Sequence, residues 1–362
     1  MQIVLYLHSL FHIKCNAMAG YREKFIKALR HIGSTIPTRL LISVTKQKLI
    51  VPVYHIISDE PVDHISPLYP IKNVKDFIKD LDFLLKNYTP IDYYNLKALI
   101  DNGKSPGKNS FLLTFDDGLR EFHDIISPIL LQKGIPSICF LNSDFIDNKK
   151  MFYRYKAGLL INAFSKNAML LKKDNVLKWF YLHSLGKQNN FSKTILSVNF
   201  RNQRFLDDLA QLINLDFNQY LLEQQPYLTG LQINSLINKG FYFGSHSCNH
   251  PEYSYLSMHE QIQQTKESVI EITNRFSLSY KTFAFPFTDY GVSKDFFQTI
   301  LEKEKIVDVS FGCAGLKRDT FCRHIQRIPF EIFDLSAKEI VNAEYIYFLL
   351  KSIFGKNVII RK

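Results

Sequence analysis

The sequence is poor in cysteine and has no long hydrophobic run. Its five cysteines are an odd number in 362 residues, and no two are spaced as Cys-x-x-Cys. A disulfide framework is therefore not expected, and a reducing compartment is favoured. No stretch approaches the roughly 18 uninterrupted apolar residues that a membrane-spanning helix needs. No DNA- or RNA-binding module is recognisable, so nucleic acid is not expected as a partner.

Positive charge and aromatic residues are abundant. The formal net charge is +11, and 46% of the residues are hydrophobic, which is enough for a sizeable core in one large or two ordinary domains. The charge favours anionic glycans, membrane surfaces or nucleic acid without choosing among them. The 30 Phe and 19 Tyr suit a groove that stacks on sugars, but packing accounts for them equally well.

Residues 14–48 hold eight basic residues and one acidic residue. They predict either a basic amphipathic helix on a membrane surface or a solvated helix docked outside the main fold. Residues 1–19 are apolar and end in small residues, but no positive charge precedes them, so a cleaved signal is not favoured. We expect a cytoplasmic or peripheral membrane location rather than secretion.

Two adjacent carboxylates follow a strand-like run from Phe111 to Phe115. The carboxyl end of a buried parallel strand opens onto the crevice where ligands bind, so Asp116 and Asp117 are candidate functional residues. Gly118 permits a sharp exit from the strand. Successive residues of a strand point to opposite sides, so the two aspartates are expected to do different work.

His246 and His250 lie four positions apart after a second strand-like run, 241–245. Two histidines and one aspartate form a three-ligand site that leaves a position open on a divalent ion. The alternative interpretation is a pair of polar side chains satisfied within a turn.

These residues belong to three ordered motifs: Thr-Phe-Asp-Asp-Gly at 114–118, His-Ser-Cys-Asn-His at 246–250 and Phe-Ala-Phe-Pro-Phe at 283–287. The set closely resembles the motifs of the polysaccharide deacetylases, the NodB-homology carbohydrate esterases. The resemblance covers about 50–145 and 229–330. It implies a distorted (β/α) barrel, removal of N-acetyl groups from an N-acetylated glycan substrate, and a divalent metal ion such as Zn²⁺, with Co²⁺ or another divalent ion as alternatives.

The resemblance also implies roles for individual residues. Asp116 is expected to be the catalytic base. The expected metal ligands are Asp117, His246 and His250. The backbone N–H of Phe287 is expected to stabilise the oxyanion.

Three further residues are candidates for substrate contact. Pro286 belongs to the groove motif, and Asp289 follows it. His55 lies where a first barrel strand, within 49–57, would open onto the active face. A histidine satisfied by neighbouring backbone is the alternative for His55.

The chain departs from the family pattern at two points. Many relatives carry an arginine two residues before the motif proline, where this chain has Ala284. We expect Arg327 to orient Asp116 instead, with Arg323 as the alternative. The late motif that supplies the general acid has no clean match, and His324 is the nearest candidate, with a structural role as its alternative.

Helical and strand-like segments alternate except in one long stretch. Ser257 with Glu260 and Ser336 with Glu339 are capping boxes that predict helix starts. Residues 147–226 instead favour helices at 155–164, 176–185 and 205–213, either as a cap over the site or as peripheral decoration or an oligomer contact. The predicted organisation is an N-terminal basic helical segment (1–48), a first barrel part (49–146), a helical insertion (147–226) and a second barrel part with a C-terminal helix (227–362).

Three functions remain open from the sequence. The first is a metal-dependent hydrolase of N-acetyl groups on amino sugars, and the second is a hydrolase of another non-peptide C–N bond. The third is a carbohydrate-binding protein that keeps the barrel but catalyses poorly. The sequence does not define the oligomeric state.

Overall fold

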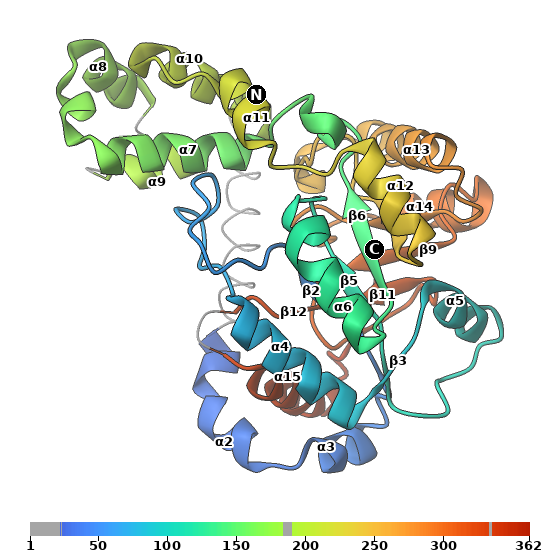
Figure 1. Cartoon of the computed structure of the whole chain (residues 1–362). Helices are drawn as coiled ribbons and strands as arrows, with labels where there is room; N and C mark the ends of the chain where they lie inside the picture. Colours follow the sequence, from blue (N-terminus) through green and yellow to red (C-terminus); the bar gives the residue numbers. More distant parts are fainter. Residues whose placement is uncertain (1–21, 23, 184–189, 333–334) are drawn as a thin grey trace.

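The computed structural model describes residues 22, 24–183, 190–332 and 335–362 (Figure 1). Its centre is an eight-stranded sheet in the order β11-β9-β8-β7-β6-β5-β2-β12, and all neighbouring strands are parallel. The strands are β2 (Pro52–Tyr54), β5 (Leu113–Phe115), β6 (Ser137–Leu141), β7 (Tyr242–Ser245), β8 (Thr282–Ala284), β9 (Val309–Gly312), β11 (His324–Gln326) and β12 (Ile328–Pro329).

The sheet closes because its two edge strands belong to one continuous segment. β11 pairs with β9, and β12, which begins after a single intervening residue, pairs with β2. The Arg327 N–H donates to the Gly312 carbonyl at 3.2 Å, and the Ile328 N–H donates to the Val51 carbonyl at 2.9 Å. The segment thus bonds to both edges, and the predicted distorted (β/α) barrel is confirmed.

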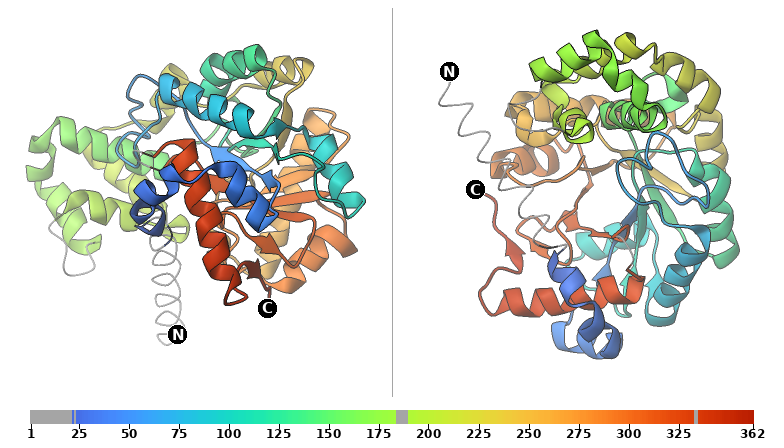
Figure 2. Two further views of the ribbon diagram at one scale, coloured as in Figure 1. Left: turned by 90° about the horizontal axis from the view of Figure 1, so that it is seen from below. Right: turned by 90° about the vertical axis from the view of Figure 1, so that its left-hand side faces the viewer.

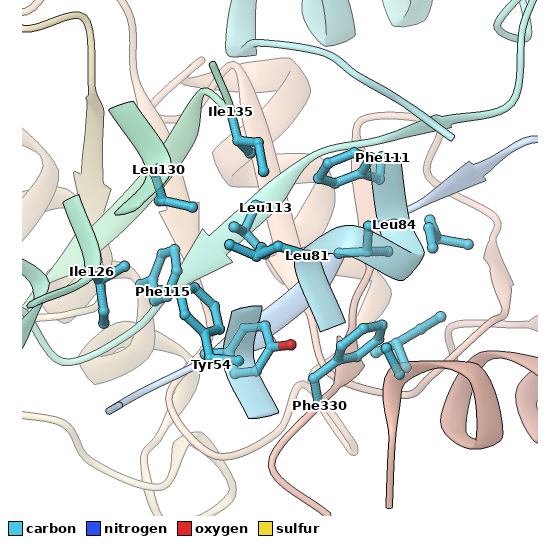
Figure 3. Close-up of a cluster of buried hydrophobic side chains, with 14 of the residues drawn as sticks. Tyr54, Leu81, Leu84, Phe111, Leu113, Phe115, Ile126, Leu130, Ile135 and Phe330 are labelled. Atoms are coloured by element: carbon cyan, nitrogen blue, oxygen red, sulfur yellow. The ribbon is translucent and has the colours of Figure 1, made fainter. Parts of the chain in front are cut away.

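Successive side chains of each strand face the barrel interior and the surrounding helices in turn. In β6, Ile138 and Phe140 pack with the interior cluster, whereas Cys139 and Leu141 pack with the outer cluster. Figure 3 shows part of this outer layer, in which side chains of β2 and β5 meet those of the neighbouring helices. The labelled residues are Tyr54, Leu81, Leu84, Phe111, Leu113, Phe115, Ile126, Leu130, Ile135 and Phe330.

Two of the helices around the barrel, α13 (Met258–Arg275) and α15 (Ala337–Ser352), begin where the sequence predicts. Both capping boxes are confirmed, Ser257 with Glu260 and Ser336 with Glu339. The helices are α4 (Val74–Asn87), α5 (Tyr93–Asp101), a π-helix (Phe122–Ile126) continuing into α6 (Ser127–Lys133), α12 (Gly230–Asn238), α13 (Met258–Arg275), α14 (Lys294–Gln298) continuing into a π-helix (Thr299–Lys303), and α15 (Ala337–Ser352).

Two predicted strands are shorter than expected. The segment 49–57 contains β1 (Leu49–Ile50) and β2, and β1 pairs with β4 (Ser110–Phe111), which also pairs with β3 (Thr89–Pro90). Strand-like sequence continues from Thr282 to Phe287 and would predict a strand of that length, but β8 ends at Ala284, because Pro286 has no N–H to donate and Phe287 has a φ of +54°. A separate two-stranded sheet joins β10 (Arg318–Asp319) to β13 (Val358–Ile359).

Residues 153–224, between β6 and α12, form a separate group of helices (Figure 1). Its bounds are α7 (Tyr153–Lys166), α8 (Asp174–His183), α9 (Phe191–Ser197), α10 (Arg204–Ile213) and α11 (Phe217–Gln224). The helices expected at 155–164 and 205–213 are confirmed, and that at 176–185 is confirmed to His183, beyond which it leaves the described residues. The sequence did not predict α9 and α11. Figure 2 (right) shows the group on the side of the barrel opposite α15.

The group has an apolar core that is shared with barrel loops. Leu160, Leu206 and Leu209 form one cluster with Ile56 and Leu119, which follow β2 and β5. The insertion is therefore packed against the carboxyl-terminal ends of the strands, where the sequence predicts the site.

The basic segment near the N-terminus is docked on α15. The Asn342 amide donates to the carbonyls of Gly33 (2.7 Å) and Ile36 (2.9 Å), in and after α2 (Arg30–Thr35), and α3 (Thr38–Thr45) follows. This packing favours the docked-helix alternative for 30–45. Residues 1–19, on which the signal-peptide question depends, lie outside the described residues. None of the described helices is long and apolar enough to cross a membrane.

Candidate active site

Three neighbouring parallel strands bring the predicted site residues together. Asp116 and Asp117 follow β5, and His246 follows β7, with only β6 between the two strands. Because parallel strands end at the same edge of a sheet, both motifs meet at one mouth of the barrel.

Asp117, His246 and His250 form a compact buried cluster. One potential ligand atom of each lies within 4.8 Å of the others. His250 Nε2 is 3.2 Å and His246 Nε2 is 3.7 Å from Asp117 Oδ1. That carboxylate oxygen is buried and accepts no hydrogen bond from the described residues. Buried carboxylate oxygens normally have partners, so a cation fits this donor set, which has two imidazoles and one carboxylate.

The orientation and charge of His246 suit a metal ligand. Its Nδ1 donates to the Ala284 carbonyl at 2.8 Å, which leaves the Nε2 lone pair directed at the cluster. Burial lowers the pKa of His246 to about 4, so the ring is neutral at pH 7. The neutral imidazole is the form that binds metals.

Asp116 points into the barrel and is held by Arg327. The guanidinium donates two hydrogen bonds, Nη1 to Oδ1 at 2.6 Å and Nη2 to Oδ2 at 2.7 Å. Burial raises the pKa of Asp116, but the charge and hydrogen bonds of Arg327, with the neighbouring imidazoles of His246 and His55, together outweigh that effect and lower it overall. Arg327 is thus the arginine in contact with Asp116, whereas Arg323 pairs with Asp101 at 2.7 Å.

The groove motif forms a tight turn beside His250. Pro286 is buried, and the Phe287 ring centroid lies 4.6 Å from that of His250 while 40% of Phe287 remains exposed. The Phe287 N–H donates no hydrogen bond within the described residues. The turn therefore presents a free backbone donor close to the metal-binding cluster.

His55 lies at the end of β2 and pairs with a glutamate that the sequence did not reveal. Its Nδ1 is 2.5 Å from Glu331 Oε2, and the other oxygen of Glu331 accepts from the Ile56 N–H at 2.9 Å. Burial lowers the pKa of His55, but the charge and hydrogen bond of Glu331, together with the charges of Asp117 and Asp116, more than compensate and raise it to about 9. Since 34% of the His55 side chain is exposed, a protonated imidazole reaches the mouth of the site.

Two predicted residues lie elsewhere and require correction. Strand alternation sends Ile325 and Arg327 inward and His324 and Gln326 outward, toward the helices around the barrel. Asp289 lies on the same outer side, where it contacts both His324 and Gln326. His324 Nδ1 is bonded to Ser310 Oγ at 2.8 Å and its Nε2 to Asp289 Oδ2 at 3.1 Å. His324 therefore has no free nitrogen to act as a general acid.

Asp289 is likewise occupied. Its carboxylate pairs with Arg361 and accepts from the Gln326 amide at 2.9 Å, and it is 2% exposed. Arg361 also pairs with Asp319 at 2.6 Å. The guanidinium supplies the positive charge in this Asp289, Asp319 and His324 group, so the group needs no metal ion, and Asp289 is not open to substrate.

The insertion contributes two contacts that the sequence did not predict. The Tyr155 hydroxyl donates to Asp117 Oδ2 at 2.6 Å, and the Phe152 ring centroid lies 4.2 Å from that of His250. No sequence signal distinguishes either residue from the packing aromatics around it.

Comparison with known proteins supports the fold. No family model and no curated protein matches the sequence. The solved structure of the Streptococcus pyogenes deacetylase PplD in complex with acetate has a TM-score of 0.51 at 14% identity, covering 82% of this chain and 97% of that one. IcaB from Ammonifex degensii has a TM-score of 0.50, also at 14% identity, over 82% and 97% of the two chains. The chain therefore shares the barrel fold of these proteins.

Proposed function

We propose that the protein is a metal-dependent hydrolase that removes N-acetyl groups from the amino sugars of a poly- or oligosaccharide. The observation that carries the proposal is a buried cluster of two histidines and one carboxylate beside a second carboxylate held by arginine. The shared fold supports it, because one structural neighbour is named a deacetylase and was solved with acetate. The sugar specificity rests on the motif resemblance.

The proposed cofactor is a divalent ion, Zn²⁺ in the first instance, with Co²⁺ or another divalent ion as alternatives. Asp117, His246 and His250 would hold it, and their donor atoms are those that zinc prefers. When bound, the ion would polarise the acetyl carbonyl and lower the pKa of a water molecule.

Asp116 is the proposed general base. Its ionised carboxylate would take a proton from the attacking water, and Arg327 keeps that carboxylate charged and fixed in direction. The Phe287 N–H would donate to the oxygen on which negative charge develops. The turn that carries this donor needs no particular side chain at 287.

His55 replaces His324 as the proposed general acid. Its raised pKa keeps the imidazole protonated at neutral pH, and Glu331 fixes the ring from the Nδ1 side. Nε2 would then give its proton to the leaving amine of the sugar. The sequence left a catalytically weak carbohydrate-binding protein open because the motif arginine and the general acid had no clear match. Arg327 and His55 are the proposed residues for these two roles.

The experiment is acetate release from N-acetylglucosamine oligomers by metal-free protein and by protein loaded with Zn²⁺ or Co²⁺. We expect release only with metal, and Asp116→Asn should bind metal as the wild type does while losing about 10²-fold or more in kcat. Turnover of small amides but of no glycan would favour the other C–N hydrolase. Glycan binding without any turnover would refute the assignment of the protein as an enzyme.

A further inference from the structure

The helical insertion reaches the candidate metal centre through Tyr155. This tyrosine lies in the first turn of α7 and is 1% exposed, and its hydroxyl donates to Asp117 Oδ2 at 2.6 Å. The other oxygen, Oδ1, is the one that faces His246 and His250. The hydroxyl therefore engages one carboxylate oxygen and leaves the other for a metal ion.

The position of α7 is fixed by a close backbone approach. At Gly158 a Cβ atom would lie 2.1 Å from the His64 carbonyl oxygen, in the loop between β2 and α4. Only glycine allows this approach without displacing one of the two segments. The His64 ring also packs edge-on against Tyr155 at 4.9 Å between centroids, and its Nδ1 is bonded to the Tyr220 hydroxyl of α11 at 2.9 Å.

A second contact joins the same segment to His250. The Phe152 ring, just before α7, packs on that imidazole at 4.2 Å between centroids, and the Phe152 N–H donates to the Tyr227 hydroxyl at 3.0 Å. Two residues at the start of α7 therefore touch two of the three candidate ligands: Tyr155 through a hydrogen bond to Asp117, and Phe152 through packing on His250.

We propose that the insertion helps to hold the metal ligands in place and that Tyr155 is a positioning residue for Asp117. The proposal rests on the proposed function, because it requires that Asp117 bind a metal ion. A carboxylate held at one oxygen offers the ion a single, fixed oxygen, whereas an unheld carboxylate must lose rotational freedom on binding. Hydrogen-bond partners of metal ligands typically contribute about 10-fold to 100-fold to metal affinity.

The test is the affinity of metal-free protein for Zn²⁺, measured by competition with a chromophoric chelator, together with the absorption spectrum of the Co²⁺ form. Tyr155→Phe should weaken Zn²⁺ binding by about 10-fold to 100-fold and alter the Co²⁺ spectrum. The matched control is Tyr153→Phe, which removes a buried hydroxyl that donates to Glu252 at 2.5 Å and not to the cluster. Its Zn²⁺ affinity should stay within about twofold of the wild type.

Gly158→Ala provides an independent perturbation that touches none of the ligands. It should push α7 away from His64 and weaken Zn²⁺ binding in the same direction as Tyr155→Phe. Tyr155→Phe is nearly isosteric, so the test remains decisive even where Gly158→Ala does not fold.

The outcomes separate this proposal from the enzyme assignment. Wild-type protein that binds Zn²⁺ and releases acetate, with unchanged affinity and Co²⁺ spectrum in Tyr155→Phe, would overturn the role of Tyr155 alone. Wild-type protein that binds no divalent ion would overturn both.

Discussion

Replacing Glu331 by glutamine should lower the pKa of the His55 imidazole. Glutamine keeps the size of the side chain and an oxygen that can accept from the Ile56 N–H, but it carries no charge. The substitution therefore removes the charge of Glu331 and the hydrogen bond that its second oxygen accepts from His55 Nδ1, and keeps the contact with Ile56. It leaves Asp116, Arg327 and the candidate metal ligands untouched.

The expected shift follows from the opposing effects on His55. Burial lowers the pKa, and the charge and hydrogen bond of Glu331 with the charges of Asp117 and Asp116 together outweigh burial and raise it from 6.5 to about 9. About a third of the side chain is exposed, and solvent screens part of the interaction, so we expect a fall of roughly one to two units in Glu331→Gln.

The same pKa defines how the pair affects folding. Because the pKa of His55 is higher in the folded state than in the unfolded state, the pair's contribution to stability is complete below pH 6.5. That contribution is lost as the pH rises through about 9. The difference in unfolding free energy between wild type and Glu331→Gln should therefore shrink across this interval in urea titrations.

Two measurements check the prediction. Histidine NMR should give a His55 pKa near 9 in the wild type, and the alkaline limb of kcat/KM should lie at the same pH and move with it in Glu331→Gln. Glu304→Gln, which removes a surface carboxylate paired with Lys266, should change neither value. A His55 pKa near 6.5 in the wild type, or a His55 pKa that does not change in Glu331→Gln, would refute the reasoning.

Two further substitutions test the scaffold of the site. Arg327→Met leaves the buried Asp116 carboxylate without its partner and should lower the free energy of unfolding by about 3–5 kcal/mol, measured by urea denaturation at pH 7; a loss below about 1 kcal/mol would contradict the buried pair. Gly118→Ala places a Cβ 2.7 Å from Leu141 Cδ2 at a residue with φ of +63°, and should cost about 1–3 kcal/mol by the same measurement. Gly103→Ala also has a positive φ (+60°) but no atom within 4 Å of the added Cβ, so the difference between the two variants isolates the clash.

The sequence predicted those parts of the site that depend on local order. A strand-like run that ends in Asp116 and Asp117 must place both at a strand end, and His246 follows from the same logic. Strand parity does not separate the two aspartates as expected, because Asp117 has a φ of +70° and both carboxylates lie 3.7 Å from His246 Nε2. The helix starts at Ser257 and Ser336 were equally predictable, because a capping box is complete within four residues.

The supporting residues depend on contacts between distant segments, which periodicity does not encode. Glu331 meets His55 across 276 positions, and Tyr155 meets Asp117 across 38 positions from within an insertion. His324 misled the sequence interpretation for a related reason. It lies only three positions from Arg327, and residues an odd number of positions apart in a strand face opposite sides. Arg327 therefore reaches the interior and His324 does not.

Barrel closure and the charge of Asp116 depend on the same segment. Residues 324–329 pair with β9 through their first half and with β2 through their second. Arg327 lies at the changeover, where its backbone N–H and its Nε both donate to the Gly312 carbonyl, at 3.2 Å and 3.1 Å. The guanidinium is thus directed at Asp116 by the bonds that close the sheet. Loosening this junction should therefore release the proposed base as well as the barrel, and loss of activity should accompany loss of stability in any variant that disturbs it.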